Sequence, residues 1–70
     1  MALESRLVRV NVYFDAEVDS FWANSPDLDG LVVTGSTRGE LQEEARAAAG
    51  TLLELEGIRA VPDLQFVDVQ

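Results

Sequence analysis

The stretch FWANSPDLDGLVVTGSTRGEL, from Phe21 to Leu41, contains the end of one strand, a turn, a second strand and the start of a helix. Pro26 fixes its own φ and pushes the residue before it into an extended conformation, and the aspartates and glycine that follow it are turn formers. Leu31–Thr34 reads LVVT, which predicts a short buried strand because β-branched residues fit a pleated surface. Gly35 is expected to end that strand.

The helix that follows has a recognisable start. Thr37 and Glu40 fit a capping box, in which the Thr37 hydroxyl accepts from the Glu40 amide and the Glu40 carboxylate reaches back. From Arg38 to Leu55 apolar residues recur every three or four positions, which predicts one amphipathic helix that ends at Gly57. Gly50 inside it costs about 1 kcal/mol relative to alanine unless a neighbour packs there. The expected apolar stripe is Leu41, Ala45, Ala48, Leu52 and Leu55.

The other strands of the sheet are predicted on either side of this stretch, together with the start of the strand that ends at Asn24. From Arg6 the sequence alternates, and the expected dry face is Val8, Val10, Val12 and Phe14. Val18–Asn24 forms the second strand of a hairpin. After a turn at Pro62, Leu64–Val69 returns to the same sheet by a right-handed crossover. The prediction is one α+β domain, residues 1–70, with the order β-β-β-α-β: a mixed, mainly antiparallel sheet with a single helix packed on one face.

Length and composition favour self-association. A chain of 70 residues buries only about 60% of its unfolded surface. There is no cysteine to form a disulfide, so oligomerisation is the remaining common reinforcement. We expect a homodimer or a higher homo-oligomer.

The charge of the chain restricts its partners. The net charge is −8, from 13 acidic and 5 basic residues. Such a field repels phosphate backbones, so direct nucleic-acid binding is not expected, whereas basic partners are attracted. The alternative is that acidity only keeps a small protein soluble. No apolar run spans a bilayer and no signal-peptide pattern is present, so no membrane association and a cytoplasmic location are expected.

The residue inventory argues against an enzyme. Histidine, cysteine and lysine are absent, which excludes imidazole bases and thiol or lysine nucleophiles. Asp15, Glu40 and Asp68 are the acids that a nuclease-like magnesium site would use, but Glu40 is explained by the capping box and the three match no motif. Gly35–Gly39 at the helix start has an alternative interpretation as an anion-binding loop, although the lysine of a P-loop is missing. We expect no catalytic residue, cofactor or metal.

Two groups of residues are candidates for protein contacts. Tyr13 and Trp22 fall on the sheet face away from the helix, where aromatic side chains either anchor an interface or simply cover the sheet. The second group lies on the helix outside the apolar stripe, where it either meets a basic partner or forms an ordinary solvated face. Its members are Glu43, Glu44 and Glu54.

Residues Tyr13 to Leu55 resemble the N-terminal domain of HicB-type antitoxins and related small HicB-like domains. The resemblance is carried by the aromatic-rich second strand, the turn Pro26-Asp27-Leu28-x-Gly30 and the helix start Gly35-x-Thr37-x-x-Glu40-Leu41. It implies a partial RNase H-like β-β-β-α-β fold that is usually self-associated. It also implies binding to a small basic toxin, a ribonuclease with a double-stranded-RNA-binding-like fold.

The resemblance has a limit. Full-length antitoxins of this kind carry a C-terminal DNA-binding module, which nothing after Val69 supplies, so autorepression by this chain is not expected. The predicted function is therefore an antitoxin-like, non-catalytic domain that self-associates and masks a basic ribonuclease. The alternatives are an orphan homo-oligomeric assembly protein and an acidic nucleic-acid mimic that inhibits a different nucleic-acid-binding protein.

Overall fold

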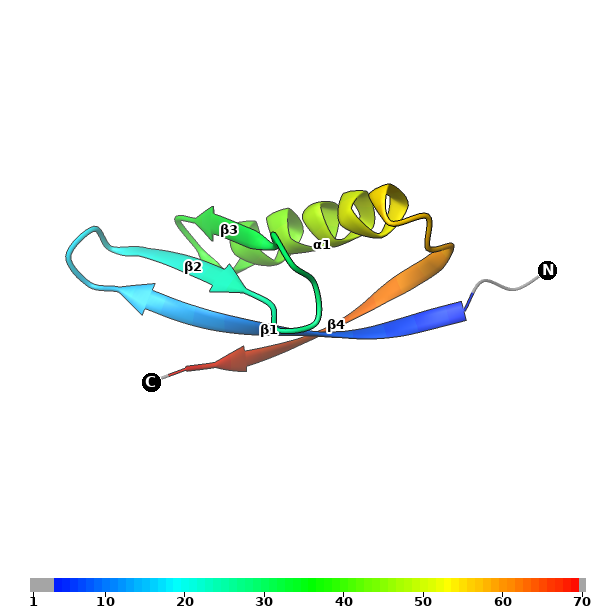
Figure 1. Ribbon diagram of the computed structural model, residues 1–70. Helices are drawn as coiled ribbons and strands as arrows, with labels where there is room; N and C mark the ends of the chain where they lie inside the picture. The colour runs from blue at the N-terminus through cyan, green and yellow to red at the C-terminus, as the bar shows by residue number, and fades with distance from the viewer. Residues whose placement is uncertain (1–3, 70) are drawn as a thin grey trace.

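A computed structural model describes residues 4–69 of the chain. The elements are β1 (Glu4–Asp15), β2 (Ser20–Asn24), β3 (Val32–Gly35), α1 (Arg38–Leu55) and β4 (Ala60–Asp68). They form one four-stranded sheet in the order β3-β2-β1-β4. The β1–β2 and β2–β3 pairs are antiparallel, and β1–β4 is parallel. The helix lies along one face of this sheet (Figure 1). The predicted β-β-β-α-β fold with a mixed sheet is confirmed.

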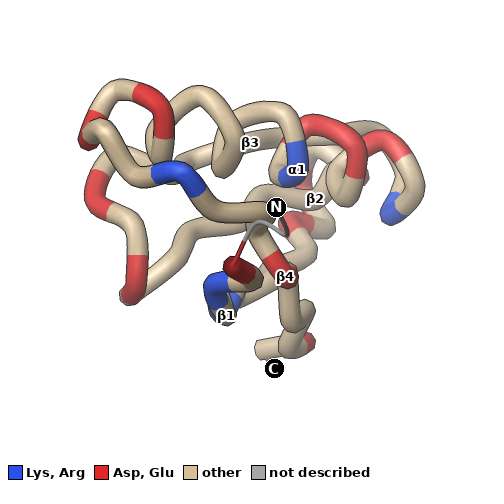
Figure 2. The backbone as a smooth tube through the Cα atoms, turned by 90° about the vertical axis from the view of Figure 1, so that its right-hand side faces the viewer, with Lys and Arg blue, Asp and Glu red and all other residues tan. Residues whose placement is uncertain are grey.

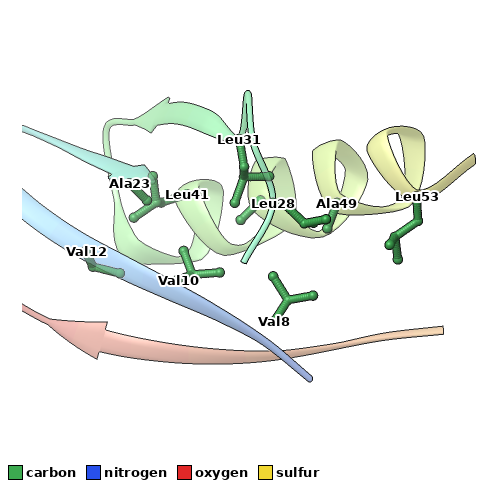
Figure 3. Packing of buried hydrophobic residues seen from close by; sticks show 10 residues of the cluster. Val8, Val10, Val12, Ala23, Leu28, Leu31, Leu41, Ala49 and Leu53 are labelled. Atoms are coloured by element: carbon green, nitrogen blue, oxygen red, sulfur yellow. The ribbon is translucent and has the colours of Figure 1, made fainter. Parts of the chain in front are cut away.

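The hydrophobic core lies between α1 and the sheet. The valines of β1 point from the sheet toward the helix, and leucine and alanine side chains of the helix pack against them (Figure 3). Alanine at the two middle positions lets the helix approach the strands closely. The buried set is Val8, Val10, Val12, Ala23, Leu28, Leu31, Leu41, Ala45, Ala49 and Leu53.

The buried stripe of the helix differs from the predicted one over its second half. Ala49 and Leu53 are buried where Ala48 and Leu52 were expected, and the expected pair is only partly buried. Leu55 is 79% exposed. The sequence AAAGTLL offers two adjacent phases at helical spacing, and periodicity alone does not separate them. The phase that continues a strict spacing of four from Leu41 is the one that packs.

The predicted capping box is present at the helix start, with one backbone donor different from the one expected. Thr37 Oγ1 accepts a hydrogen bond from the Glu40 amide at 3.1 Å. The Glu40 carboxylate reaches back as expected, but it accepts from the backbone N–H of Ser36 at 3.0 Å, one residue before the cap. Two backbone donors at the helix start are therefore satisfied by side chains.

The helix ends in a Schellman motif built on Gly57. This glycine has φ +73°, the left-handed conformation that the sequence predicted for it. Its N–H donates to the Glu54 carbonyl at 3.0 Å, and the Ile58 N–H donates to the Leu53 carbonyl at 2.9 Å. These are the two bonds that define the motif. Ile58 then packs against the core.

The paired part of the β1–β2 hairpin is shorter than predicted. β2 begins at Ser20 rather than Val18, because residues 16–19 form the turn and Asp19 adopts a positive φ of 50°. Val18 is consequently exposed. Phe14 was expected in the core, but it is 52% exposed. It packs instead against Phe21, with ring centroids 5.0 Å apart.

The third strand is displaced by one residue from the prediction. It runs Val32–Gly35, so Leu31 is buried in the connection before it and Val32 is exposed. The prediction of a buried strand was wrong because alternate side chains of β3, including Val32, point to the sheet face away from the helix, while Val33 packs against the core. Gly35 ends the strand under the helix start, where an added Cβ would lie 2.7 Å from the Leu41 backbone nitrogen. Only glycine fits there without a backbone shift.

Pro62 lies inside β4 and does not mark a turn. It pairs in register with Arg6, and β4 begins two residues earlier than the proline. The Val69 N–H donates to the Val12 carbonyl at 2.8 Å. Because the backbone groups of successive residues in a strand point to opposite sides, the N–H and C=O groups of the odd-numbered β4 residues point toward β1. Pro62 therefore faces the outer edge, where its missing N–H interrupts no ladder bond.

Two glycine-to-alanine substitutions are expected to have opposite effects. A Cβ at Gly50 would meet nothing within 4 Å, so Gly50→Ala should raise the free energy of unfolding by about 0.5–1 kcal/mol. Gly57→Ala should lower it by about 1 kcal/mol, because φ +73° is costly for an L side chain. Urea titrations at one fixed protein concentration measure both. A destabilised Gly50→Ala variant would contradict the open space beside that position.

Candidate protein-interaction surface

The sheet face away from α1 is not covered by any other element of residues 4–69 (Figure 1). The registers of the strand pairs place alternate side chains of all four strands on it. We call this surface the open face. Its central members are Leu7, Arg9, Asn11, Tyr13, Trp22, Asn24, Val32, Thr34, Val61, Asp63, Gln65 and Val67.

An aromatic pair occupies the open face at the β1–β2 boundary. Tyr13 and Trp22 are direct cross-strand partners. Their rings stack with centroids 4.2 Å apart and an interplanar angle of 12°. Trp22 remains exposed to solvent. The structure thus brings together the two aromatic residues that the sequence predicted for this face, and they form one flat hydrophobic surface.

Aliphatic side chains extend the apolar surface on both sides of the stack. Leu7, Val61 and Val67 are exposed on the β1–β4 side, and Val32 is exposed on the β3 side. Between them, Asn11 Nδ2 donates to Asn24 Oδ1 at 3.5 Å, a long contact. Exposed apolar residues scattered singly are ordinary, but several on one sheet face form the kind of patch that binds another molecule.

A surface ion pair fastens the β2–β3 connection to β1. Asp27 accepts from the backbone N–H of Arg9 at 2.8 Å and from its guanidinium at 2.9 and 3.1 Å. These hydrogen bonds hold the pKa of the Asp27 carboxyl at about 2, below its ordinary 3.8, and they raise the pKa of Arg9. The Arg9 N–H lies beyond the last β1–β2 pair, Asn11 with Asn24. Asp27 therefore takes the place of a missing strand partner.

The predicted acidic residues lie on the other side of the molecule. Glu43, Glu44 and Glu54 are exposed on α1, and α1 packs on the sheet face opposite Tyr13 and Trp22. Within residues 4–69 the ion pairs are Arg9–Asp27 and Arg38–Asp68, and neither involves these glutamates. Figure 2 shows acidic positions distributed around the chain with few basic ones among them. The two groups of candidate residues therefore belong to separate surfaces.

The three acids considered for a metal site each have a local partner. Asp15 accepts from the Glu17 amide at 3.0 Å, and Glu40 caps the helix start. Asp68 pairs with Arg38 through contacts of 2.7 and 3.0 Å. In the described part of the chain no group of three His, Cys, Asp or Glu side chains is arranged to hold a metal ion.

Backbone N–H groups at the Gly35–Gly39 helix start already donate to side chains of the helix cap. The N–H of Ser36 is bound by the Glu40 carboxylate, and the N–H of Glu40 is bound by Thr37. Arg38 points its guanidinium at Asp68. An incoming anion would have to displace a carboxylate already bound there, so the geometry favours the capping interpretation over an anion-binding loop. Among the described residues, no helix is both long enough and apolar enough to cross a bilayer.

Sequence reasoning missed two features of the open face. The Arg9–Asp27 pair joins residues 18 positions apart, and no local pattern indicates such a contact. Val61 was missed because Pro62 was interpreted as a turn, which removed the first residues of β4, whereas Val67 lay inside the predicted strand but was not named as a surface residue. The alternation from Val61 to Val67 was a usable signal, since an edge strand tolerates proline.

Comparison with known proteins shows that another protein has the same fold. No family model matches the sequence, and no curated protein matches it. Among solved structures, the chain is similar to the hypothetical protein TTHA1013 from the extremely thermophilic bacterium Thermus thermophilus. The TM-score is 0.80 at 25% sequence identity, and the match covers 93% of this chain and 94% of that one. The two chains therefore share the whole fold.

The Asp27 carboxyl should make stability depend on pH at the acid end. Its folded pKa of about 2 lies below the ordinary 3.8, so its contribution is present above pH 4 and is lost as the pH falls from about 4 to about 2. We expect Asp27→Asn to be less stable than the unsubstituted chain at pH 7. The difference should shrink as the pH approaches 2. Urea unfolding at fixed protein concentration across this range measures it.

Asp29→Asn is the matched control for this measurement. It removes the same charge from the same connection, but the Arg9 hydrogen bonds go to Asp27. Its effect at pH 7 should be smaller. Equal effects of the two substitutions would show that general charge, and not the bond to Arg9, determines the stability.

Proposed function

We propose that this chain is a non-catalytic protein-binding domain of the antitoxin type, which self-associates and masks a small basic ribonuclease. The observation that carries the proposal is the pair of separate surfaces. One is the apolar open face, and the other is the outer side of α1 with its unpaired carboxylates Glu43, Glu44 and Glu54. A domain built this way can hold its own copy and a different partner at the same time.

Electrostatics favours a basic partner for the helix surface. The chain carries a net charge of −8, which steers a basic protein toward it and raises the association rate. Ribonucleases bind the phosphates of RNA through cationic side chains. Carboxylates from α1 would occupy those positions and exclude RNA from the active site by competition. This mechanism needs no reaction by the domain itself.

The absence of catalysis in the proposal is supported by the residue inventory and by the geometry of the acids. The sequence offers no histidine, cysteine or lysine. The candidate acids Glu40 and Asp68 already serve the helix cap and the pair with Arg38. The fold similarity to the Thermus thermophilus protein adds no function, because that protein is itself hypothetical.

A triple substitution tests the helix surface. The chain is co-expressed with the product of a short basic reading frame adjacent to its gene, and RNA cleavage by that product is measured. Glu43→Gln, Glu44→Gln and Glu54→Gln together should weaken inhibition at least about tenfold and reduce its dependence on salt, since exposed charges act through a screened field. The unsubstituted chain should inhibit fully.

A matched control separates charge from position. Glu4→Gln, Glu17→Gln and Asp19→Asn remove the same three charges from the strand start and the hairpin turn, away from α1, and asparagine tolerates the positive φ of position 19. This variant should inhibit like the unsubstituted chain. If no basic neighbouring product exists, or if its activity is unaffected by the chain, the antitoxin proposal is wrong and self-assembly alone is favoured.

A further inference from the structure

We propose that the open face is the contact between two copies of this chain, which pack sheet against sheet about a two-fold axis. The inference rests on the self-association in the proposed function and names the surface responsible. The stacked Tyr13 and Trp22 lie within this contact, and α1 of each copy lies on the outside. In the resulting four-layer arrangement the helix surface of each copy remains free.

The charge distribution of the chain favours a second copy as the molecule that binds the open face. Every copy has a net charge of −8, so most ways of bringing two copies together place acidic surfaces in contact. The open face is poor in charge: on the strand positions that point to it, the charged residues are Arg9, Asp15 and Asp63. Arg9 is already neutralised by Asp27. The face therefore allows approach of a like-charged molecule with the least repulsion.

Beyond the Arg9–Asp27 pair, the charges that remain on the strand positions of the face are Asp15 and Asp63, and Asp63 can be accommodated next to Arg9 of a second copy. Arg9 and Asp63 lie on neighbouring strands, two positions apart in register. In a two-fold contact the same patch meets itself, so residue i meets j and j meets i. An axis near the middle of β1 brings Asp63 of each copy toward Arg9 of the other.

The size of the face fits a stable contact. The molecule measures 45 × 19 × 18 Å, and the sheet runs along its length. A face of that outline provides an area on the order of 800 Å² per partner, which is the standard size for specific complexes. Facing sheets pack about 10 Å apart, a gap that Leu7, Val61, Val67 and the aromatic stack can fill from both sides.

Face-to-face packing is favoured over pairing at the sheet edges. At the β4 edge, Pro62 presents no N–H to an added strand. At the β3 edge the strand is only four residues long. The β4 edge is interrupted by a proline and the β3 edge is short, which favours the open face as the contact between copies.

Matched lysine substitutions test the surface. Val67 on the open face is 45% exposed, and Val18 in the hairpin turn is 66% exposed. Val67→Lys and Val18→Lys make the same change in charge and size. Sedimentation equilibrium should show the dimer dissociation constant raised at least about tenfold by Val67→Lys, since a charge would be buried. Val18→Lys should leave it unchanged.

Thiol protection provides a second test that does not depend on the folding of a lysine variant. The chain has no cysteine, so a single one reports on its own position. Gln65→Cys on the open face should react slowly with a maleimide at high protein concentration and faster on dilution. Ala47→Cys on the exposed side of α1 should react equally at both concentrations.

The outcomes separate this inference from the proposed function. A dimer in which Gln65→Cys is unprotected and Val67→Lys has no effect overturns the open face as the contact, while self-association stands. A monomer at all concentrations overturns both. Protection of Gln65→Cys only after addition of the basic neighbouring product assigns the face to that partner and overturns the inference. A Val67→Lys monomer that still inhibits the ribonuclease supports two independent surfaces.

Discussion

The structure depends on one constraint: a single helix covers only one face of a four-stranded sheet. The stripe from Leu41 to Leu53 buries the valines of β1, and no second layer covers the side chains on the opposite side of that strand. Residues 4–69 contain no second helix that could close that side. The apolar content of the open face follows from this, because an isolated two-layer domain gains stability by burying its second face.

The elements that were predicted correctly are those with local chemical signals. The helix bounds Arg38–Leu55 and both ends were predicted, because the Thr37–Glu40 cap and Gly57 act within a few residues of each other. The strand order in the chain was also predicted, from alternation and turn residues. The position of Tyr13 and Trp22 on the far face followed from the same alternation, whereas their direct pairing depends on the register of β1 with β2.

The errors have a common origin in tertiary context. The phase of the helix after Ala45 depends on which side chains meet β1, and the sequence offered two phases. Phe14 and Val32 looked like core residues, but Phe14 lies at the hairpin end and Val32 points to the open face, so both are exposed. The place of Pro62 depended on β4 being an outer strand. In each case the decisive fact was a neighbour distant in sequence, as it was for Arg9 and Asp27.

The parallel pairing of β1 with β4 has a consequence for how the chain reaches this structure. β1 is an inner strand, yet one of its two neighbours is the last element of the domain, with Glu4 aligned to Ala60. During synthesis the edge of β1 that pairs with β4 therefore stays unpaired until more than fifty further residues have emerged, at roughly 5–20 residues per second. Long-range closure of this kind slows folding. A ribosome stalled before β4 would hold a hairpin and helix with an unprotected inner strand, a substrate for chaperones or proteases.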